Sequence, residues 1–458
     1  MAPFRATISP GVLGDDGVGM TEFEQRSSIE QLRQAPRPRS LPLAPLADPA
    51  RRNLPLLATP TEVDRVRPVY CVWEVTLACD LACRHCGSRA GKARPDELNT
   101  EQALDLAGQL IDLGLKEVTL IGGEAYLRAD WLQIVNKLAR AGLAVSIATG
   151  GRGMTADIAQ AAADAGLAAA SVSLDGMRLS HDRLRGAAGS FDAGLRAMGH
   201  LKAAGLKVYN NSQINRLTYQ DFPELLETII EQGSEAWQIM LTVPMGRAVD
   251  EPDVLLQPYE LLQVFPMLAQ LKKRADEANV LIWRGNTLGY FGPYESLFQG
   301  WTPRGHGGSC GAGKLSMGIE ADGTIKGCPS LGTKKWGGGN SRDARLEDIW
   351  MRAEPLRYNR TRTKKELWGY CAQCYYADTC KAGCTWMSDM LLGRPGNNPY
   401  CHHRALEMNA QGLRERVRRT QAAPGQPFDQ GLFELLLEPV PPSTADQPAT
   451  AAPATEEP

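Results

Sequence analysis

The sequence has no excess of charge of one sign, because 50 lysines and arginines stand against 52 aspartates and glutamates in 458 residues. Such a balance provides no global basic field for nucleic acid. The chain also contains no apolar run approaching the roughly 18 residues that a membrane helix requires, and its first residues, MAPFRATISPGVLGDDG, contain no signal-peptide core. We therefore expect a cytoplasmic protein without a nucleic-acid or membrane partner.

Histidine is scarce, with six residues, whereas cysteine is frequent, with eleven. The cytoplasm keeps thiols reduced, and these cysteines form an odd-numbered set that is bunched too closely to pair across a fold. Both features count against a disulfide framework and favour metal binding by thiolates. Cys71 stands apart from the other ten in an apolar segment, and we expect it to be a core residue.

The two ends of the chain differ from its middle in lacking a periodic apolar pattern. Residues 1–66 are rich in proline, with one candidate short helix, and we expect an N-terminal extension without a core of its own. Residues 421–458, which finish in proline, alanine and threonine, are expected to form a largely disordered tail. The folded part is therefore expected between residues 67 and 420.

Short β-rich apolar runs alternate with amphipathic helical segments over residues 67–290. The six runs lie at residues 69–78, 117–124, 144–151, 169–176, 206–215 and 236–245. Six consecutive β-α units indicate a parallel sheet covered by helices, either an open doubly wound sheet or a barrel. Over residues 291–420 the pattern changes to glycine, cysteine and short strands, where KLSMGIEADGTIKGC predicts a hairpin that turns at Asp-Gly. These residues are expected to form a second, small domain.

Three cysteines follow the first predicted strand, in the stretch VTLACDLACRHCGSRAG. Cys79, Cys83 and Cys86 have the spacing C-x3-C-x2-C. Three thiolates can hold an iron-sulfur cluster by three corners and leave one iron open to a ligand. The carboxyl end of a parallel strand is also where ligands bind in such sheets. A structural zinc site with His85 or His181 as the fourth ligand is the alternative, which explains the metal but not the position.

Two further polar segments end predicted strands. The second strand ends in Gly122, Gly123 and Glu124, where glycines let the backbone approach a ligand and a carboxylate can meet an ammonium group. The fourth strand ends with Ser173 and Asp175, which offer polar groups to a ligand. Because the carboxyl ends of parallel strands meet at one edge, these segments and the cysteines predict a single site.

These motifs together resemble the radical SAM superfamily, whose hallmark is C-x3-C-x2-C after the first strand of a (β/α)6 partial barrel. The family's GGE-type motif is matched by residues 122–124, although Ala125 replaces the proline that usually follows. A second passage of the family is matched by residues 173–176 and by His181, Asp182, Arg185, Gly186, Gly189, Ser190 and Phe191. The resemblance implies an α/β fold with a (β/α)6 partial TIM barrel over residues 67–290.

The resemblance also implies the cofactors of this site. Cys79, Cys83 and Cys86 would bind a [4Fe-4S] cluster whose open iron chelates S-adenosylmethionine (AdoMet). Reductive cleavage of AdoMet would release a 5′-deoxyadenosyl radical that abstracts hydrogen from a substrate.

The same resemblance assigns the AdoMet contacts. Glu124 and the backbone of the Gly-Gly turn before it would take the methionyl ammonium. Ser173 and Asp175 would line the ribose side, and Arg185 would pair with the carboxylate.

Seven more cysteines lie in the second domain, in the order C-x12-G-x4-C, a gap, C-x2-C-x5-C-x3-C, and a last cysteine. They are Cys310, Cys328, Cys371, Cys374, Cys380, Cys384 and Cys401. Four thiolates make one closed cluster site, so seven suffice for one complete site and one site that lacks a ligand.

The seven-cysteine pattern resembles the SPASM domain, a small α+β extension of radical SAM enzymes that binds auxiliary iron-sulfur clusters. Carried over by position, the resemblance assigns an outer cluster to Cys371, Cys374, Cys380 and Cys401. It assigns an inner cluster to Cys310, Cys328 and Cys384, with an open iron or a non-cysteine ligand. Both clusters are expected to be [4Fe-4S].

SPASM domains occur mainly on enzymes that modify ribosomally made peptides. The leading hypothesis is therefore the oxidative modification of a precursor peptide, such as a cross-link, with flavodoxin or ferredoxin as the electron donor. Residues 1–66 lack the strand pattern of a winged-helix element that would bind a leader peptide. A separate leader-recognition protein is therefore a candidate partner.

Other functions remain as alternatives. Formylglycine formation is disfavoured, because sulfatase-maturing members carry an aspartate where this chain has Pro329. A tetrapyrrole-modifying enzyme of haem biosynthesis is the second hypothesis, because the segment from Trp73 to Cys86, with His85, resembles those members closely. A non-enzymatic iron-sulfur carrier or scaffold would explain ten of the cysteines but not the GGE motif.

Overall fold

The computed structural model of the chain describes residues 66–300, 302 and 306–441. The predicted N-terminal extension lies outside these residues apart from residue 66, and so do residues 442–458 of the predicted tail. No helix among the described residues is long and apolar enough to cross a membrane.

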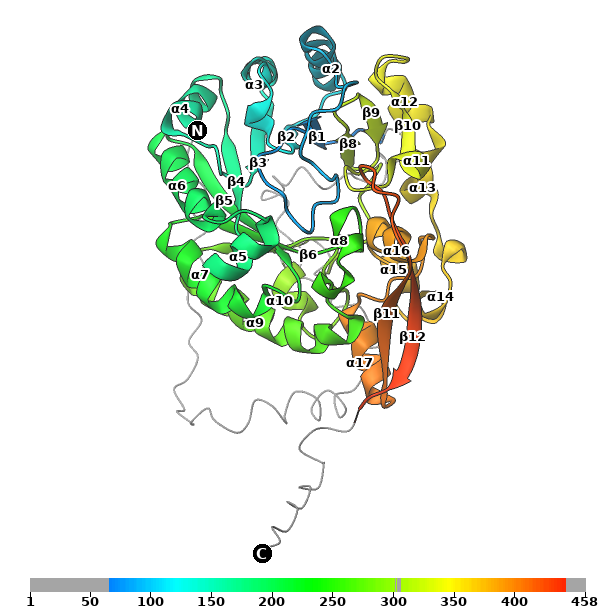
Figure 1. Cartoon of the computed structure of the whole chain (residues 1–458). Helices are drawn as coiled ribbons and strands as arrows, with labels where there is room; N and C mark the ends of the chain where they lie inside the picture. The colour runs from blue at the N-terminus through cyan, green and yellow to red at the C-terminus, as the bar shows by residue number, and fades with distance from the viewer. Residues whose placement is uncertain (1–65, 301, 303–305, 442–458) are drawn as a thin grey trace, which may run out of the picture. The chain divides into compact units, whose positions relative to one another are not determined.

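A parallel sheet with one helix or more after most of its strands forms the first part of the fold (Figure 1). Its strands are β1 (Tyr70–Thr76), β2 (Glu117–Gly122), β3 (Ala144–Thr149), β4 (Ala169–Ser173), β5 (Lys207–Ile214), β6 (Ala236–Leu241) and β7 (Leu281–Arg284). All six neighbouring pairs in this order are parallel. Strand β7 is an addition to the six predicted strands, and its alternation of exposed and buried residues over only four positions explains why the pattern was missed.

The connections between these strands are helical. They are α2 (Thr100–Asp112), η3 (Ala125–Leu127), α3 (Trp131–Arg140), α4 (Ala156–Asp164), α5 (Arg178–Arg185), α6 (Ser190–Ala203), η4 (Tyr219–Asp221), α7 (Phe222–Glu231), α8 (Arg247–Asp250), η5 (Pro252–Val254), η6 (Pro258–Glu260), α9 (Leu261–Glu277) and, after β7, α10 (Glu295–Gln299). Buried residues alternate with partly or fully exposed ones along β3, β5 and β6, so one face of the sheet is buried more completely than the other. Cys71 is fully buried in β1, which confirms its predicted place in the core.

The cysteine-rich part of the chain continues this sheet at its β1 edge. Its elements are β8 (Ser316–Ile319), β9 (Thr324–Lys326), α11 (Thr333–Trp336), β10 (Gly337–Asn340), α12 (Leu346–Arg352), α13 (Glu354–Thr361), η7 (Lys364–Glu366), α14 (Tyr370–Gln373), α15 (Ala377–Cys380), α16 (Thr385–Leu392) and α17 (His402–Ala410). β8 pairs with β1 in parallel and with β9 antiparallel, so the predicted hairpin is present. The resulting sheet runs from β10 to β7 as ten strands, and both end strands have one open edge among the described residues, as in a partial barrel.

The C-terminal segment differs from its prediction. Instead of a disordered tail from residue 421, the chain forms an antiparallel hairpin of β11 (Leu413–Gln421) and β12 (Leu432–Pro439). The alternation in LFELLLEP provides one buried side chain, Phe433, and the strand partner is the arginine-rich β11, whose charges pair with Glu434 and Glu438. Cross-strand ion pairs of this kind carry no apolar signal in the sequence.

Candidate functional site

The loop that carries Cys79, Cys83 and Cys86, residues 78–91, is closed at its base by backbone hydrogen bonds; we call it the triad loop. The Cys79 N–H donates to the Gly91 carbonyl at 3.0 Å, and the Gly91 N–H donates to the Leu77 carbonyl at 2.9 Å. The loop therefore leaves β1 and returns beside it, which holds the three thiols at the carboxyl edge of the sheet.

The end of α5 supports the middle of the triad loop. The N–H groups of Ala82 and Arg84 donate to the carbonyls of Arg185 and Leu184, at 3.2 and 2.8 Å. Gly186 follows in a left-handed conformation, and a Cβ atom there would lie 2.6 Å from the Ala82 carbonyl oxygen. A side chain at this position would therefore collide with the backbone of the triad loop.

The glycines of the GGE motif face the end of β1 and the start of the triad loop. A Cβ atom on Gly122 would lie 2.1 Å from the Thr76 carbonyl oxygen, and one on Gly123 would lie 2.1 Å from the Ala78 oxygen and 2.6 Å from Cβ of Cys79. The N–H of Gly123 donates to Thr76 and that of Glu124 donates to Ala78, both at 2.8 Å. Because these glycines have no side chains, the end of β2 can approach the end of β1 and the triad loop closely.

Glu124 is buried beside this loop, with 1% of its surface exposed. Its carboxylate accepts hydrogen bonds from Thr149 Oγ1 at 2.5 Å and from the Gly150 N–H at 2.6 Å. Burial raises the pKa of Glu124 to about 7, although these two hydrogen bonds lower it. A partly protonated carboxyl group of this kind gains its charge when a cation arrives.

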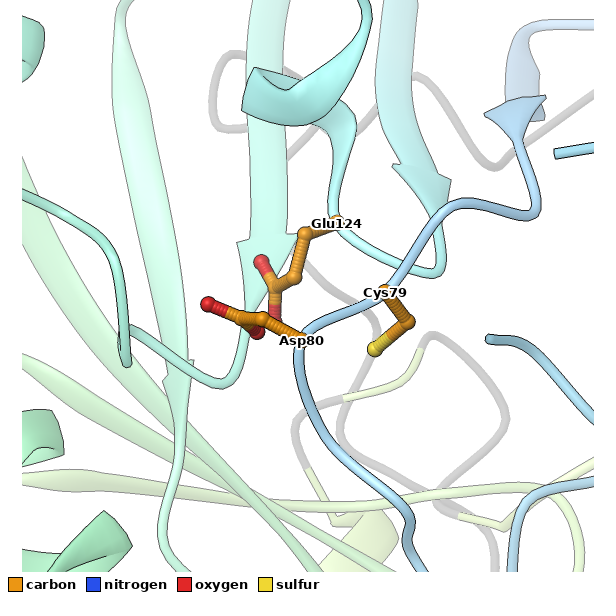
Figure 2. A group of neighbouring side chains, drawn as sticks. All are labelled: Cys79, Asp80 and Glu124. Atoms are coloured by element: carbon orange, nitrogen blue, oxygen red, sulfur yellow. The ribbon is translucent and has the colours of Figure 1, made fainter. Parts of the chain in front are cut away.

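Asp80 brings a second carboxylate to Glu124, as Figure 2 shows. Ligand atoms of Cys79, Asp80 and Glu124 all lie within 4.8 Å of one another. Oδ1 of Asp80 is buried without a hydrogen-bond partner among the described residues, whereas Oδ2 accepts from Tyr126 at 3.2 Å. Two adjacent carboxylates with an unused buried oxygen favour a cationic group, and the amino group of AdoMet is one.

Asp175 and Arg185 form a buried ion pair behind the triad loop. The Asp175 carboxylate is fully buried and accepts from Arg185 Nε at 2.7 Å, Arg185 Nη2 at 2.6 Å and the Gln213 N–H at 2.8 Å. Burial alone would raise the pKa of Asp175, but Arg185 and His85 lower it below its usual range. The other arginine nitrogen, Nη1, lies 3.8 Å from the Cys83 sulfur.

This ion pair is an addition to the predicted roles of the two residues. Asp175 is predicted at the ribose and Arg185 at the AdoMet carboxylate, and in this structure each is the main partner of the other. Ser173 is also nearly buried, and its hydroxyl accepts from Asn211 Nδ2 at 3.0 Å. Motif position alone could not distinguish a ligand contact from an ion pair between strand β4 and helix α5.

Four cysteines of the second set line one cavity. They are Cys371, Cys374, Cys380 and Cys401, the residues expected to hold the outer cluster. Backbone N–H groups of Asn398 and Tyr376 donate to two of the sulfurs, at 3.4 Å each. Burial raises the pKa of the Cys401 thiol to about 12. A metal would therefore have to displace its proton, as metals do with coordinating thiols.

The remaining three cysteines, Cys310, Cys328 and Cys384, lie near one another. Cys310 packs in an apolar cluster with Leu331 and Trp336, and Cys328 packs against that cluster. Burial raises the pKa of Cys384, and the nearby thiols of Cys310 and Cys328 raise it further. The predicted grouping into four and three is thus the grouping in which the structure places these side chains.

The spacing of the cysteine sulfur atoms distinguishes a single zinc ion from an iron-sulfur cluster. Tetrahedral zinc with bonds of about 2.3 Å to sulfur places thiolates about 3.8 Å apart. In the part of the chain that the structure describes, only Cys79, Asp80 and Glu124 bring three ligand atoms within 4.8 Å. The three cysteine sets, with or without His85 and His181, are therefore too wide for one ion, whereas a cluster spaces its thiolates further apart.

Comparisons with known proteins agree with this geometry. Residues 73–229 match the model of the radical SAM superfamily, and residues 310–375 match the SPASM model, an iron-sulfur cluster-binding domain. The chain therefore contains a radical SAM domain and a SPASM domain. Iron-sulfur clusters and AdoMet are the cofactors of these domains.

Relatives of two kinds cover most of the chain. The AdoMet-dependent heme synthase of Nitratidesulfovibrio vulgaris is 27% identical over 359 residues, which are 73% of this chain and 92% of that protein. The mycofactocin maturase MftC of Mycolicibacterium smegmatis is 29% identical over 342 residues, which are 73% of this chain and 82% of that protein. The crystal structure of Streptococcus suis SuiB bound to S-adenosylmethionine superposes with a TM-score of 0.55 and 18% identity, covering 70% of this chain and 74% of that one, and shows the shared fold.

Sequence reasoning missed two residues of the site. Asp80 directly follows the first cysteine, but one acidic residue beside a cysteine carries no specific signal. Gly246 follows β6 with a φ of 58°, and a Cβ atom there would lie 2.4 Å from the carbonyl oxygens of Cys86 and Gly87. Only the tertiary structure shows that this glycine lets the chain after β6 pack against the triad loop.

Proposed function

We propose that the chain catalyses an AdoMet-dependent oxidative modification of a ribosomally synthesised peptide. The observation that carries this proposal is the division of ten cysteines into a triad at the barrel edge and two sets of four and three in the SPASM domain. The maturase MftC matches over most of its length. An oxidative cross-link removes two hydrogen atoms from the peptide, which requires an acceptor for the second electron, and auxiliary clusters provide one.

In this proposal Cys79, Cys83 and Cys86 hold the [4Fe-4S] cluster that binds AdoMet. Reductive cleavage of AdoMet at that cluster supplies a 5′-deoxyadenosyl radical, which abstracts one hydrogen atom from the substrate. Glu124, joined by Asp80, accepts the methionyl ammonium, because a buried and a partly buried carboxylate lie close together there and favour a cation.

Two polar residues support the AdoMet cluster from behind. Asp175 orients Arg185. The Nη1 atom of Arg185 faces the Cys83 sulfur, and its positive charge favours the thiolate form of Cys83. Ser173 keeps its proposed place on the ribose side. The predicted domain limits, 67–290 and 291–420, remain part of the proposal, with the second domain extended to residue 441 by the hairpin.

The auxiliary clusters are proposed at the two further cysteine sets. Cys371, Cys374, Cys380 and Cys401 hold the outer cluster around their common cavity. Cys310, Cys328 and Cys384 hold the inner cluster and leave one iron for substrate or for another ligand. A precursor peptide as substrate, a flavodoxin or ferredoxin as reductant, a separate leader-recognition protein and a cytoplasmic setting complete the proposal. The eleven cysteines, all free of disulfides, suit a reducing compartment.

Tetrapyrrole modification is the second candidate, because the heme synthase relative is covered over 92% of its length. One experiment separates the two. The reconstituted protein is incubated with AdoMet, reductant and either short peptides encoded beside its gene or a porphyrin, and 5′-deoxyadenosine and product masses are measured. A peptide that loses two hydrogen atoms supports the proposal. A modified porphyrin with unchanged peptides overturns it, and no 5′-deoxyadenosine with any substrate leaves only the carrier function.

A further inference from the structure

The loop between β11 and β12, residues 422–431, reaches the triad loop although the two are separated by more than three hundred residues. Its residues 424–427 are exposed, whereas Phe428 is 8% exposed and adopts a left-handed φ of 55°. A buried phenylalanine in this conformation within an exposed turn indicates that the surrounding structure holds it in place. Figure 1 shows the hairpin rising from α17 toward β8. We call residues 425–429 the hairpin tip.

Two direct bonds join the hairpin tip to the residues that follow Cys86. The Phe428 N–H donates to the Gly87 carbonyl at 3.2 Å. Arg89 Nε donates to Asp429 Oδ1 at 2.9 Å, across 340 positions of sequence. The Asp429 side chain is only 6% exposed and that of Arg89 is 14% exposed, so water screens this pair less than a surface pair.

Arg89 depends on its partners for its conformation. Its φ of 52° is left-handed, which is unfavourable for an arginine. Its remaining nitrogens donate to Asp250 Oδ2 at 2.6 Å and to the Gly246 carbonyl at 3.0 Å. The triad loop is therefore held between the segment after β6 and the hairpin tip.

Asp429 organises the tip as well as its contacts. Its second oxygen, Oδ2, accepts from the Gln426 N–H at 2.9 Å and from the Gly425 N–H at 2.5 Å, and its backbone carbonyl accepts from Gly246 at 3.0 Å. One carboxylate thus closes the turn and binds Arg89 at the same time.

The Phe428 ring extends the same contact into the SPASM domain. Lys326 Nζ lies 3.9 Å from the ring centroid, and this lysine is fully buried on β9, two residues before Cys328. Cation–π contacts strengthen when they are shielded from water. The hairpin tip therefore contacts both the loop of the proposed AdoMet cluster and the strand that leads to the inner cluster.

We propose that Asp429 and Phe428 are positioning residues that keep Cys86 in place on the AdoMet cluster. This inference rests on the proposed function, because it requires that the triad holds the cluster. With three protein ligands, the cluster is released once the triad loop opens, and the hairpin tip opposes that opening from outside the barrel. The hairpin is then a functional part of the AdoMet site.

The test compares Asp429→Asn and Phe428→Ala with a matched control, Glu434→Gln, in reconstituted full-length protein. Glu434 lies on β12 of the same hairpin, outside the tip, and its carboxylate pairs with Arg418 of β11 and not with the triad loop. Iron transfer to a chelator is followed over time, and electron paramagnetic resonance identifies the AdoMet cluster by the change in its signal when AdoMet is added. We expect the AdoMet cluster to be lost about tenfold faster in both tip variants, and at the wild-type rate in Glu434→Gln.

The outcomes are distinguishable. Loss of the AdoMet-dependent signal ahead of the auxiliary clusters, with an unchanged melting temperature, supports the inference. Equal release rates for the tip variants and wild type overturn it, and so does uniform loss of all clusters with a lowered melting temperature. If wild type has no AdoMet-dependent signal and the same iron content as Cys86→Ala, the proposed function itself fails.

Discussion

The two kinds of cysteine set in this protein are built in opposite ways. The triad lies on one short loop, and the structure supports that loop from four sides: the end of α5, the GGE segment, the chain after β6 and the hairpin tip. The outer auxiliary set comes from separate segments, since Cys371 to Cys380 lie around α14 and α15 and Cys401 lies at the start of α17. A loop with three ligands needs external support and keeps an open position, whereas four ligands from several elements close a site and tie those elements together.

The largest effect that tests this difference is expected from Cys83→Ala. The triad then has two ligands, and we expect 5′-deoxyadenosine release to fall by more than about a thousandfold, with about four iron atoms lost per chain. Spectra of the auxiliary clusters should stay unchanged, because no ligand of those clusters is removed. Loss of all iron would contradict the independence of the sites.

Cys374→Ala should affect the outer auxiliary set and leave the triad intact. We expect loss of the outer cluster and of peptide product, while AdoMet cleavage stays within roughly threefold of wild type because the triad is untouched. Limited proteolysis should cut near α14 and α15 sooner, since their shared metal is gone. If the variant keeps the wild-type yield of peptide product, the outer cluster is not required for the reaction.

Gly123→Ala tests the support of the triad loop without touching a ligand. The new Cβ would lie 2.1 Å from the Ala78 carbonyl oxygen, so we expect a stability loss of about 1–3 kcal/mol by overpacking and weaker retention of the AdoMet cluster alone. Gly91→Ala is the matched control, because nothing lies within 4 Å of a Cβ there although Gly91 closes the same loop. Chemical unfolding and iron analysis of both variants measure the effect; equal behaviour would refute close packing as the reason for the GGE glycines.

The smallest effect on cluster retention is expected at Glu74, a buried carboxylate of β1 that lies near the charged side chains of Arg94, Glu320 and Lys326. Burial raises the pKa of Glu74 on β1 to about 8, against the lowering effect of Arg94. Between the ordinary value of 4.5 and about 8 the folded protein binds this proton and the unfolded chain does not, so this group makes folding less favourable as pH rises. Glu74→Gln should therefore gain stability over wild type across that window, by roughly 1–3 kcal/mol at its upper end. Denaturation at several pH values measures the gain, and a constant difference between the two proteins would disprove the prediction.

Several parts of the fold and the site could be predicted because their signals are local. The six β-α units and the β8–β9 hairpin at Asp-Gly follow from local sequence patterns, and the division of the cysteines is what the resemblance to the SPASM domain implies. Strand β7 has only four residues, which is too short for a periodic pattern to be recognised. The β11–β12 hairpin contains arginine–glutamate ion pairs, and a sequence rich in these charges looks like a solvent-exposed segment. The N-terminal extension over residues 1–65 lies outside the described residues, and its character stays a prediction from composition.

The sequence by itself determined the radical SAM and SPASM assignment, because thiolate spacing on short segments is a local property. The tertiary structure alone decided which polar groups face each other. It pairs Asp175 with Arg185, sets Gly123 against the triad loop, and joins Asp429 to Arg89. Such contacts connect residues far apart in the chain, and they depend on the twist and packing of whole elements, which leave no periodic trace in the residues themselves.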